Sequence, residues 1–223
     1  VFDYAIGSLI EQQASRFGLT VSYDGVSALS LAGAEKKIVL ASGGEIAAKA
    51  VILCMGASPR KLGLADEERL TGAGISYCAT CDGAFFKGQD VAVIGGGDTA
   101  LSDALYLARF CPSVTVVHRR DALRAAAALQ KAAFAESKIH FAWNSVVDAI
   151  EGTDKLSGLV LRNMNTGETE RLAVSGAFVA VGIVPRTELV KDQLTLDKGG
   201  SIQTDGEMRT SLPGVFAAGD IRN

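Results

Sequence analysis

Two cysteines separated by two residues form the most reactive pair of side chains in this 223-residue sequence. Cys78 and Cys81 frame a Cys-Ala-Thr-Cys segment. Thiols at this spacing can close into a disulfide and reopen, and such motifs hold one thiolate at a lowered pKa. The carboxyl group of Asp82, the next residue, could move the protons that dithiol–disulfide exchange requires. Asp82 could also cap a helix, and the two roles do not exclude each other.

Zinc binding is the alternative interpretation of this segment, and it would need a second pair of ligands. The remaining cysteines, Cys54 and Cys111, are isolated in apolar stretches, and His118 and His140 do not form a pair with ligand spacing. We therefore predict no metal site. Cys54 and Cys111 are interpreted as inert residues of the core.

A glycine-rich turn follows a short apolar run and precedes a helical pattern. Gly95 would permit a tight turn, Gly97 would let the backbone approach a pyrophosphate, and Ala100 would allow close packing of helix on strand. Asp98 and Thr99 open the helix, whose first N–H groups can bind phosphate. The context favours dinucleotide binding over the alternative, a glycine-rich turn without a ligand.

Basic residues stand where the second strand ends, at the position that decides between NADH and NADPH. An NADH site has an acid about 20 residues after the glycines, which accepts from the ribose 2′-hydroxyl. This sequence has His118, Arg119 and Arg120 there, with Arg124 one helical turn further. Arginine grips phosphate with two parallel hydrogen bonds, so the pattern favours NADPH. A solvated basic corner is the alternative.

These residues require a βαβ unit, predicted as a strand at Val91–Ile94, a helix at Asp98–Phe110 and a strand at Val114–Val117. Further helices are expected at Val1–Phe17, ending at Gly18, and at Asp121–Glu136. Further strands are expected at Val21–Tyr23, Ile38–Leu40, Ile46–Leu53, Ile139–Trp143, Val146–Glu151, Leu156–Arg162, Glu170–Val174, Ala177–Val181 and within Gly214–Asp220. The continuous apolar run Ala50–Gly56 is interpreted as a buried parallel strand.

Composition excludes several classes of protein. Lys and Arg number 22 against 25 Asp and Glu, a net charge of −3, so the basic footprint of a nucleic-acid-binding protein is missing. Hydrophobic residues make up 48%, enough to exclude disorder as the main state. No apolar run approaches the roughly 18 residues of a membrane span, and no signal peptide opens the sequence. With two of four cysteines in one Cys-x-x-Cys motif, a cytoplasmic redox protein is the interpretation we favour.

Taken together, the motifs resemble those of the bacterial low-molecular-weight thioredoxin reductases. The matching segments are Cys78–Gly83, Val93–Ala100, His118–Arg120 with Arg124, and Gly214–Asp220. The resemblance implies an α/β flavoprotein in which a Rossmann-like NADPH domain is inserted into an FAD-binding domain, and which works as a homodimer. Electrons would pass from NADPH through FAD and the Cys78–Cys81 disulfide to thioredoxin.

The resemblance also implies roles for individual residues. Cys81 would lie nearest the flavin, Cys78 would attack the thioredoxin disulfide, and Asp82 would be the acid/base partner. Gly95, Gly97 and Ala100 would hold the NADPH pyrophosphate, Arg119, Arg120 and Arg124 the 2′-phosphate, and Gly219 and Asp220 the flavin pyrophosphate and ribitol.

The sequence departs from this family's pattern in the FAD-binding domain. No G-x-G-x-x-G precedes Cys54, and the chain stops at Asn223, before the helix that covers the flavin. The family's A-T-G is Cys54-Met55-Gly56 here, and Arg186 replaces the Asn of G-x-x-P-N-T. We expect an NADPH domain at residues 57–181, incomplete FAD-domain parts at 1–56 and 182–223, and a longer parent enzyme.

Two other functions stay open at the level of sequence. The chemistry could serve another thioredoxin-like or peroxiredoxin partner. Alternatively, these 223 residues could form an NADPH-binding module without turnover.

Overall fold

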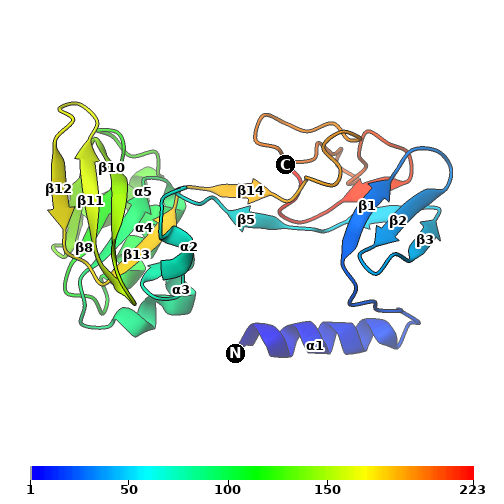
Figure 1. Cartoon of the computed structure of the whole chain (residues 1–223), viewed down its shortest axis with the longest axis horizontal. Helices are drawn as coiled ribbons and strands as arrows, with labels where there is room; N and C mark the ends of the chain where they lie inside the picture. Colours follow the sequence, from blue (N-terminus) through cyan, green and yellow to red (C-terminus); the bar gives the residue numbers. More distant parts are fainter. Residues whose placement is uncertain (1) are drawn as a thin grey trace. The chain divides into compact units, whose positions relative to one another are not determined.

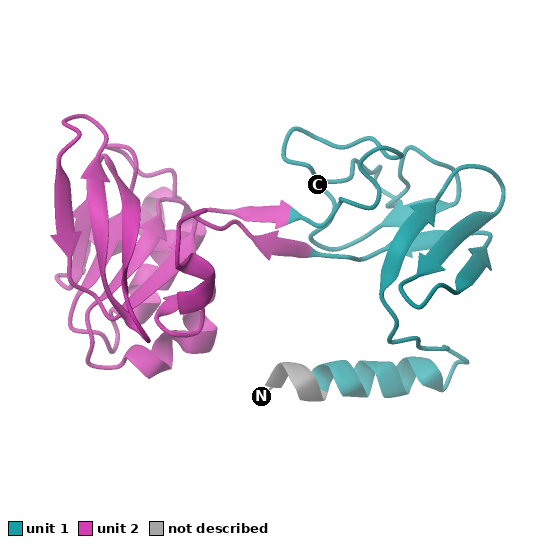
Figure 2. Cartoon of the chain, viewed as in Figure 1, with its two compact units in different colours: residues 1–56, 185–223 teal, residues 57–184 magenta. Residues whose placement is uncertain are grey.

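The chain enters and leaves its central segment through a two-stranded ribbon of β5 (Ala57–Pro59) and β14 (Ile183–Pro185). Backbone hydrogen bonds continue this pairing at both ends, from Arg60 to Gly182 at 2.9 Å and from Arg186 to Gly56 at 3.0 Å. The computed structural model describes residues 2–223. Residues 57–184 form one compact unit, and residues 1–56 with 185–223 form the other (Figure 2).

The central unit is built on a five-stranded sheet in the order β6-β13-β7-β8-β9, all parallel. Its strands are β6 (Ile75–Ser76), β7 (Val91–Gly95), β8 (Val114–Val117), β9 (Ile139–Ala142) and β13 (Gly176–Ala180). Its helices are α2 (Glu67–Leu70), α3 (Ala79–Asp82), the 3₁₀ turn η1 (Gly83–Phe86), α4 (Asp98–Leu107) and α5 (Ala127–Ala135). An antiparallel sheet of β10 (Ser145–Gly152), β11 (Leu156–Asn163) and β12 (Thr169–Leu172) completes it (Figure 1).

Alternating side chains of β7 divide the core of this unit into two layers. Val91 and Val93 pack with Leu101 and other residues of α4 on one face of the sheet. Ala92 and Ile94 pack on the opposite face, against residues of the antiparallel sheet. Both faces are thus covered, which accounts for the uninterrupted apolar sequence of β7.

The outer unit contains α1 (Phe2–Ser15), an antiparallel sheet and a parallel strand pair. The sheet is β1 (Val26–Ser30), β2 (Lys36–Leu40) and β3 (Glu45–Ala48), and the pair is β4 (Val51–Leu53) with β15 (Val215–Ala217). Leu53, Val215 and Ala217 belong to its core. The unit therefore places the end of β15 and the residues that follow it beside the end of β4.

The α/β class with a parallel sheet is as predicted, and so is the order of strand, turn, helix and strand in residues 91–117, although the helix ends at Leu107 and not at Phe110. The first helix is confirmed within the described residues; Val1 lies outside them. It is followed by Gly18 in the left-handed region at φ 85°.

Several predictions of local structure were wrong. No strand forms at residues 21–23; β1 begins at Val26, because the pairing with β2 joins Val26 to Leu40. The segment 46–53 is two strands, since β3 pairs with β2 while β4 pairs with β15. The strand within Ala50–Gly56 is parallel, as predicted, but it is not buried, since Ile52 is 67% exposed. Residues 121–126 are not helical. Two hydrogen bonds tie this loop to the glycine-rich turn and α4, from Arg124 N to Gly96 O and from Ala126 N to Asp98 Oδ1.

Candidate active site

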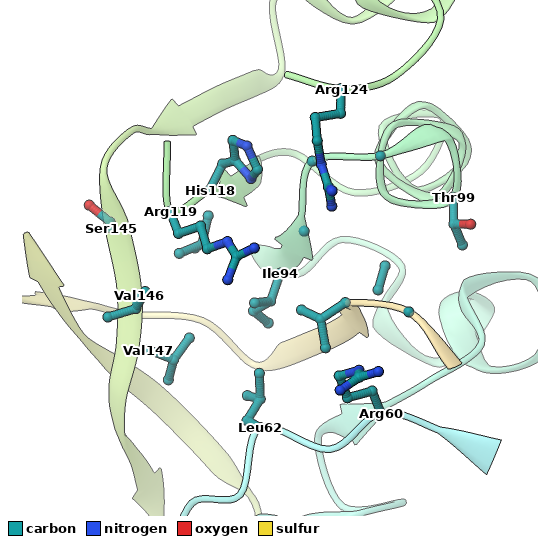
Figure 3. Close-up of a pocket in the computed structure, with 17 residues that line it drawn as sticks. Arg60, Leu62, Ile94, Thr99, His118, Arg119, Arg124, Ser145, Val146 and Val147 are labelled. Atoms are coloured by element: carbon teal, nitrogen blue, oxygen red, sulfur yellow. The ribbon is translucent and has the colours of Figure 1, made fainter. Parts of the chain in front are cut away.

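A pocket of about 600 Å³ opens where three neighbouring parallel strands, β7, β8 and β13, reach their carboxyl ends (Figure 3). Gly95 ends β7, Val117 ends β8 and Ala180 ends β13, and all three line the pocket. Ligands of open α/β sheets bind at this edge. Its volume lies within the roughly 300–1,000 Å³ that is usual for small-molecule and cofactor pockets.

The first two glycines of the turn are needed for packing. A side chain at Gly95 would meet the carbonyl oxygen of Ala180 at 2.4 Å and the Cβ of Ala100 at 2.9 Å. A side chain at Gly96 would lie 2.3 Å from atoms of the His118 ring. Neither position can therefore carry a Cβ without displacing its neighbours.

Gly97 differs from these two glycines, because nothing lies within 4 Å of a Cβ placed there. It precedes α4 in an extended conformation with φ −99°, and no side chain caps the helix at this residue. Gly97 and Thr99 both line the pocket. The N-terminus of the ten-residue helix α4 thus faces open space, where its N–H groups can bind an anion.

Two sequence-predicted residues of this segment do not line the pocket. Asp98 accepts a hydrogen bond from Ala126 N at 2.6 Å, so its carboxylate holds the loop before α5. Ala100 is completely buried against the β7 side of α4. Ala100 therefore contributes to the packing of the turn, whereas Asp98 is exposed beside the pocket.

Arg119 and Arg124 are the two sequence-predicted arginines that line the pocket, and Figure 3 shows both guanidinium groups extending into it. The backbone N–H of Arg124 donates to Gly96 O at 2.8 Å, which fixes this residue next to the glycine-rich turn. Arg120 is exposed and is not among the residues that line the pocket. Two of the three predicted arginines thus meet at one site.

His118 is a packing residue of the pocket wall. Its ring is 5% exposed, lies against Gly96 and places Nε2 3.1 Å from the carbonyl oxygen of Ala122. Burial lowers its pKa, and the charges of Arg124, Arg120 and Arg119 lower it further, against the opposing effect of the Ala122 carbonyl. The ring is therefore neutral at pH 7, and the positive charge of the pocket comes from arginine.

The facing wall was not predicted from the sequence. Arg60 and Leu62 come from the segment after β5, and Ser145, Val146 and Val147 come from β10 (Figure 3). No local pattern marks these residues. Strand pairing alone brings them to the glycine-rich turn. For Arg60 the sequence did hold one indication, because this residue lies close to the predicted domain boundary at residues 56 and 57.

A buried carboxylate supports that wall. Glu67 is 2% exposed and accepts hydrogen bonds from the N–H groups of Leu62 and Gly63 and from the hydroxyl of Tyr77, each at 2.8 Å. Burial acts to raise the pKa of Glu67, but these bonds outweigh it and the pKa lies below its ordinary value. Burial and the Glu67 charge raise the pKa of Tyr77 to about 12. The network joins the pocket wall to the residue that precedes Cys78.

Cys78 and Cys81 form a disulfide, as the spacing allowed. Cys78 is the residue before α3, and its Sγ accepts a hydrogen bond from Cys81 N at 3.2 Å. The hydroxyl of Thr80 lies 3.4 Å from the same sulfur. Both groups would stabilise a thiolate on Cys78 after the disulfide is reduced.

The carboxylate of Asp82 does not cap the 3₁₀ turn that follows it. It accepts a hydrogen bond from Ser76 Oγ at 2.7 Å instead. The helix-cap interpretation is therefore wrong for this side chain, and the carboxylate is held next to the disulfide segment.

The two remaining cysteines differ from each other. Cys111 is buried, as predicted, and burial followed by the charge of Asp90 raises its pKa to about 11, which makes it inert. Cys54 is exposed, so its assignment to the core was wrong. It follows β4, which pairs with β15 as a two-stranded sheet and leaves its far face uncovered, as Ile52 with 67% exposure illustrates.

Gly219 and Asp220 lie in the outer unit, after β15, and both are exposed. Gly219 has φ 78°, and no atom lies within 4 Å of a Cβ built there. An open glycine and a free-standing carboxylate at the carboxyl end of a parallel strand suit the approach of a dinucleotide. Within residues 2–56 no glycine-rich phosphate loop accompanies them.

Two negative findings concern residues 2–223. No group of three or more His, Cys, Asp or Glu side chains gathers there into an arrangement that could hold a metal ion. None of the helices described has the length and apolar character that a membrane crossing demands.

The fold and site match one family of redox proteins. Residues 8–223 match the family model of the pyridine nucleotide-disulphide oxidoreductases, and the chain belongs to this family. It is similar to the thioredoxin reductase of Streptomyces coelicolor, with 53% identity over 210 residues, which is 94% of this chain and 65% of the relative.

Solved structures give the same result. The crystal structure of Lactococcus lactis thioredoxin reductase in its FR conformation is 46% identical with a TM-score of 0.81, covering 90% of this chain and 66% of that one. The crystal structure of T. acidophilum thioredoxin reductase is 30% identical with a TM-score of 0.82. The match covers 99% of this chain and 72% of that one. The resemblance predicted from the motifs is confirmed. This chain spans about two thirds of the length of these relatives.

Proposed function

We propose that this chain is the NADPH-binding and dithiol-bearing part of an enzyme that reduces the disulfide of thioredoxin. The observation that carries the proposal is the presence, in one compact unit, of a Cys-x-x-Cys disulfide and of a pocket lined by Arg60, Arg119 and Arg124 at the carboxyl ends of parallel strands. The family and the named relatives support the same reaction.

NADPH is the nucleotide proposed for the pocket. Its pyrophosphate would lie over Gly97 and the N-terminus of α4, where space for a ligand is open. The 2′-phosphate would be bound by Arg119 and Arg124, which line the pocket. Arg120 would contribute only its longer-range charge. Arg60 stands on the facing wall as a further cation for the ligand's phosphates.

FAD is the second cofactor proposed, in keeping with the family. When bound, it accepts two electrons from NADPH and passes them to a disulfide. Gly219 and Asp220 are the residues proposed to contact it, and no glycine-rich phosphate loop lies within residues 2–56.

The dithiol is proposed to work in two steps. Reduction of the Cys78–Cys81 disulfide takes up two electrons and two protons. The Cys78 thiolate then attacks the thioredoxin disulfide and displaces one thioredoxin thiolate, and the Cys81 thiolate attacks the mixed disulfide, which releases reduced thioredoxin. Asp82 would supply the proton that the leaving thiolate needs. The Thr80 hydroxyl would stabilise the attacking thiolate.

The wider assignments are part of the same proposal. Residues 57–181 would be the NADPH domain, with parts of an FAD-binding domain at 1–56 and 182–223. We also propose a cytoplasmic enzyme that works as a homodimer, with neither nucleic acid nor membrane as a partner.

The experiment that tests the dithiol role replaces Cys78 by Ser in the full-length, FAD-containing protein. Thioredoxin reduction should stop, while NADPH oxidation by an artificial electron acceptor continues at the wild-type rate. Cys111→Ala is the matched control and should preserve both activities. Thioredoxin reduction that survives Cys78→Ser would overturn the assignment.

A further inference from the structure

One buried hydroxyl group holds the carboxylate of Asp82. Ser76 Oγ donates to Asp82 Oδ2 at 2.7 Å, and Ser76 is 4% exposed. Among the described residues, Ser76 is the one donor within hydrogen-bond distance of this carboxylate. The position of the carboxylate beside the disulfide therefore depends on a single side chain.

The hydroxyl of Ser76 is better placed to donate to Asp82 than to its other possible acceptor. Two acceptors surround Ser76 Oγ, the Asp82 carboxylate at 2.7 Å and the carbonyl oxygen of Cys78 at 3.3 Å. The shorter, charge-assisted bond takes the single proton. On its other side, the same oxygen accepts the backbone N–H of Cys78 at 3.1 Å. The hydroxyl is thus oriented from both sides and links Asp82 to the backbone of Cys78.

Ser76 lies in the parallel sheet of the unit, whereas Asp82 lies in a short helix. Ser76 belongs to β6, which pairs in parallel with β13, with Ser76 opposite Phe178. Asp82 ends the four-residue helix α3, where Thr80 and Cys81 are exposed. A hydrogen bond from a buried strand residue limits the movement of the Asp82 carboxylate, which is the usual means of keeping a reacting group in position.

A small pocket of about 130 Å³ gives the same pair of side chains access to water. Ser76 and Asp82 line it together with Phe85, Phe86 and Gly74. Its volume admits more than one water molecule, and its polar side is formed by these two residues. A proton on Asp82 can therefore exchange with water at this point.

We propose that Ser76 is a positioning residue of the thiol–disulfide exchange. Its hydroxyl holds the Asp82 carboxyl group towards the Cys78–Cys81 segment, and water in the small pocket restores the proton that Asp82 gives to the leaving thiolate. The inference rests on the proposed function, because it assumes that Asp82 is the proton donor.

The test compares Ser76→Thr with Ser76→Val in the full-length, FAD-containing protein. The two side chains have the same shape and suit a strand, so any packing strain is shared and the difference between them reports the hydroxyl group. Ser76→Thr should keep the wild-type rate and pH profile of thioredoxin reduction. Ser76→Val should be slower by about tenfold, a part of the 10²–10⁴ that a general acid contributes, with a shifted pH profile.

A double-mutant cycle separates positioning from a structural effect. If Ser76 acts through Asp82, Ser76→Val should change the rate less than twofold in an Asp82→Asn background. Ser157→Ala, which removes an exposed hydroxyl of the same unit, is the control and should change neither thioredoxin reduction nor NADPH oxidation by an artificial acceptor. Equal losses in both backgrounds, or equal rates for the Thr and Val variants, would overturn the proposal.

A second readout keeps the inference separate from the proposed function. Reduction of the Cys78–Cys81 disulfide by dithiothreitol, followed against pH, needs no thioredoxin, and the leaving thiolate that Asp82 would protonate is then Cys78 or Cys81 itself. Here too the Val variant should be slower than the Thr variant. If the wild-type protein reduces no thioredoxin but the Val variant is still reduced more slowly than the Thr variant, the proposed function is wrong and the role of Ser76 is supported. If the two variants are reduced by dithiothreitol at equal rates, the role of Ser76 is wrong.

Discussion

Replacing Arg119 by Ala should weaken the binding of NADPH and leave the binding of NADH nearly unchanged. Only NADPH carries the 2′-phosphate, and Arg119 extends into the pocket where that group is proposed to bind (Figure 3). A hydrogen bond to a charged group contributes about 1.5–3 kcal/mol, which corresponds to a change in Kd of about tenfold to about hundredfold. Arg119 is exposed to solvent, so the lower end of that range applies.

The assay is calorimetric titration of each nucleotide at two salt concentrations. Arg120→Ala is the matched control, since this neighbouring arginine does not line the pocket, and it should cost less than threefold. Higher salt should weaken NADPH binding to the wild type more than to Arg119→Ala. An equal loss of NADH and NADPH affinity, or a cost for Arg120→Ala as large as that for Arg119→Ala, would refute the assignment.

Three further outcomes are expected. Gly97→Ala should leave the free energy of unfolding within about 1 kcal/mol of wild type but weaken nucleotide binding. Gly96→Ala should lower the free energy of unfolding by about 1–3 kcal/mol, because its Cβ would meet the His118 ring. Urea denaturation measures the first quantity and titration with NADPH the second. The folded-state pKa of His118 is below 6.5, so stability should fall as pH drops through 6.5, and a His118→Gln variant should lose that part of the slope. The folded-state pKa of Glu67 is below 4.5, so its stabilising contribution is present above pH 4.5 and lost below it. In a Glu67→Gln variant, the free energy of unfolding measured with urea should decrease less steeply in acid than in the wild type. An unchanged slope would contradict the network described for Glu67.

The sequence predicts the parts of the site that lie close together along the chain. The turn at Gly95–Gly97 follows an apolar strand and opens a helix, so local spacing is enough to place it. Arg119 and Arg124 follow the neighbouring strand, and parallel strands bring their carboxyl ends to one edge. Short-range pattern and the geometry of a βαβ unit therefore account for this half of the pocket.

The other half depends on pairing between distant segments, which no local pattern encodes. Arg60 reaches the pocket through the ribbon with β14, and Val146 reaches it through β10. Glu67 stands in a segment rich in charge that looks exposed, yet its carboxylate is buried because three backbone N–H groups and a tyrosine hydroxyl converge on it. The same limit applies to Ser76, whose partner Asp82 is six residues away across a turn and a short helix.

The most direct test of the central claim is NADPH-driven reduction of thioredoxin by the full-length protein with FAD, using NADH as the control. The account predicts that NADPH is consumed only while thioredoxin disulfide is present, with one disulfide reduced per NADPH, and that NADH is a poor substitute. Consumption of NADPH without loss of the thioredoxin disulfide, or equal rates with NADH, would contradict it.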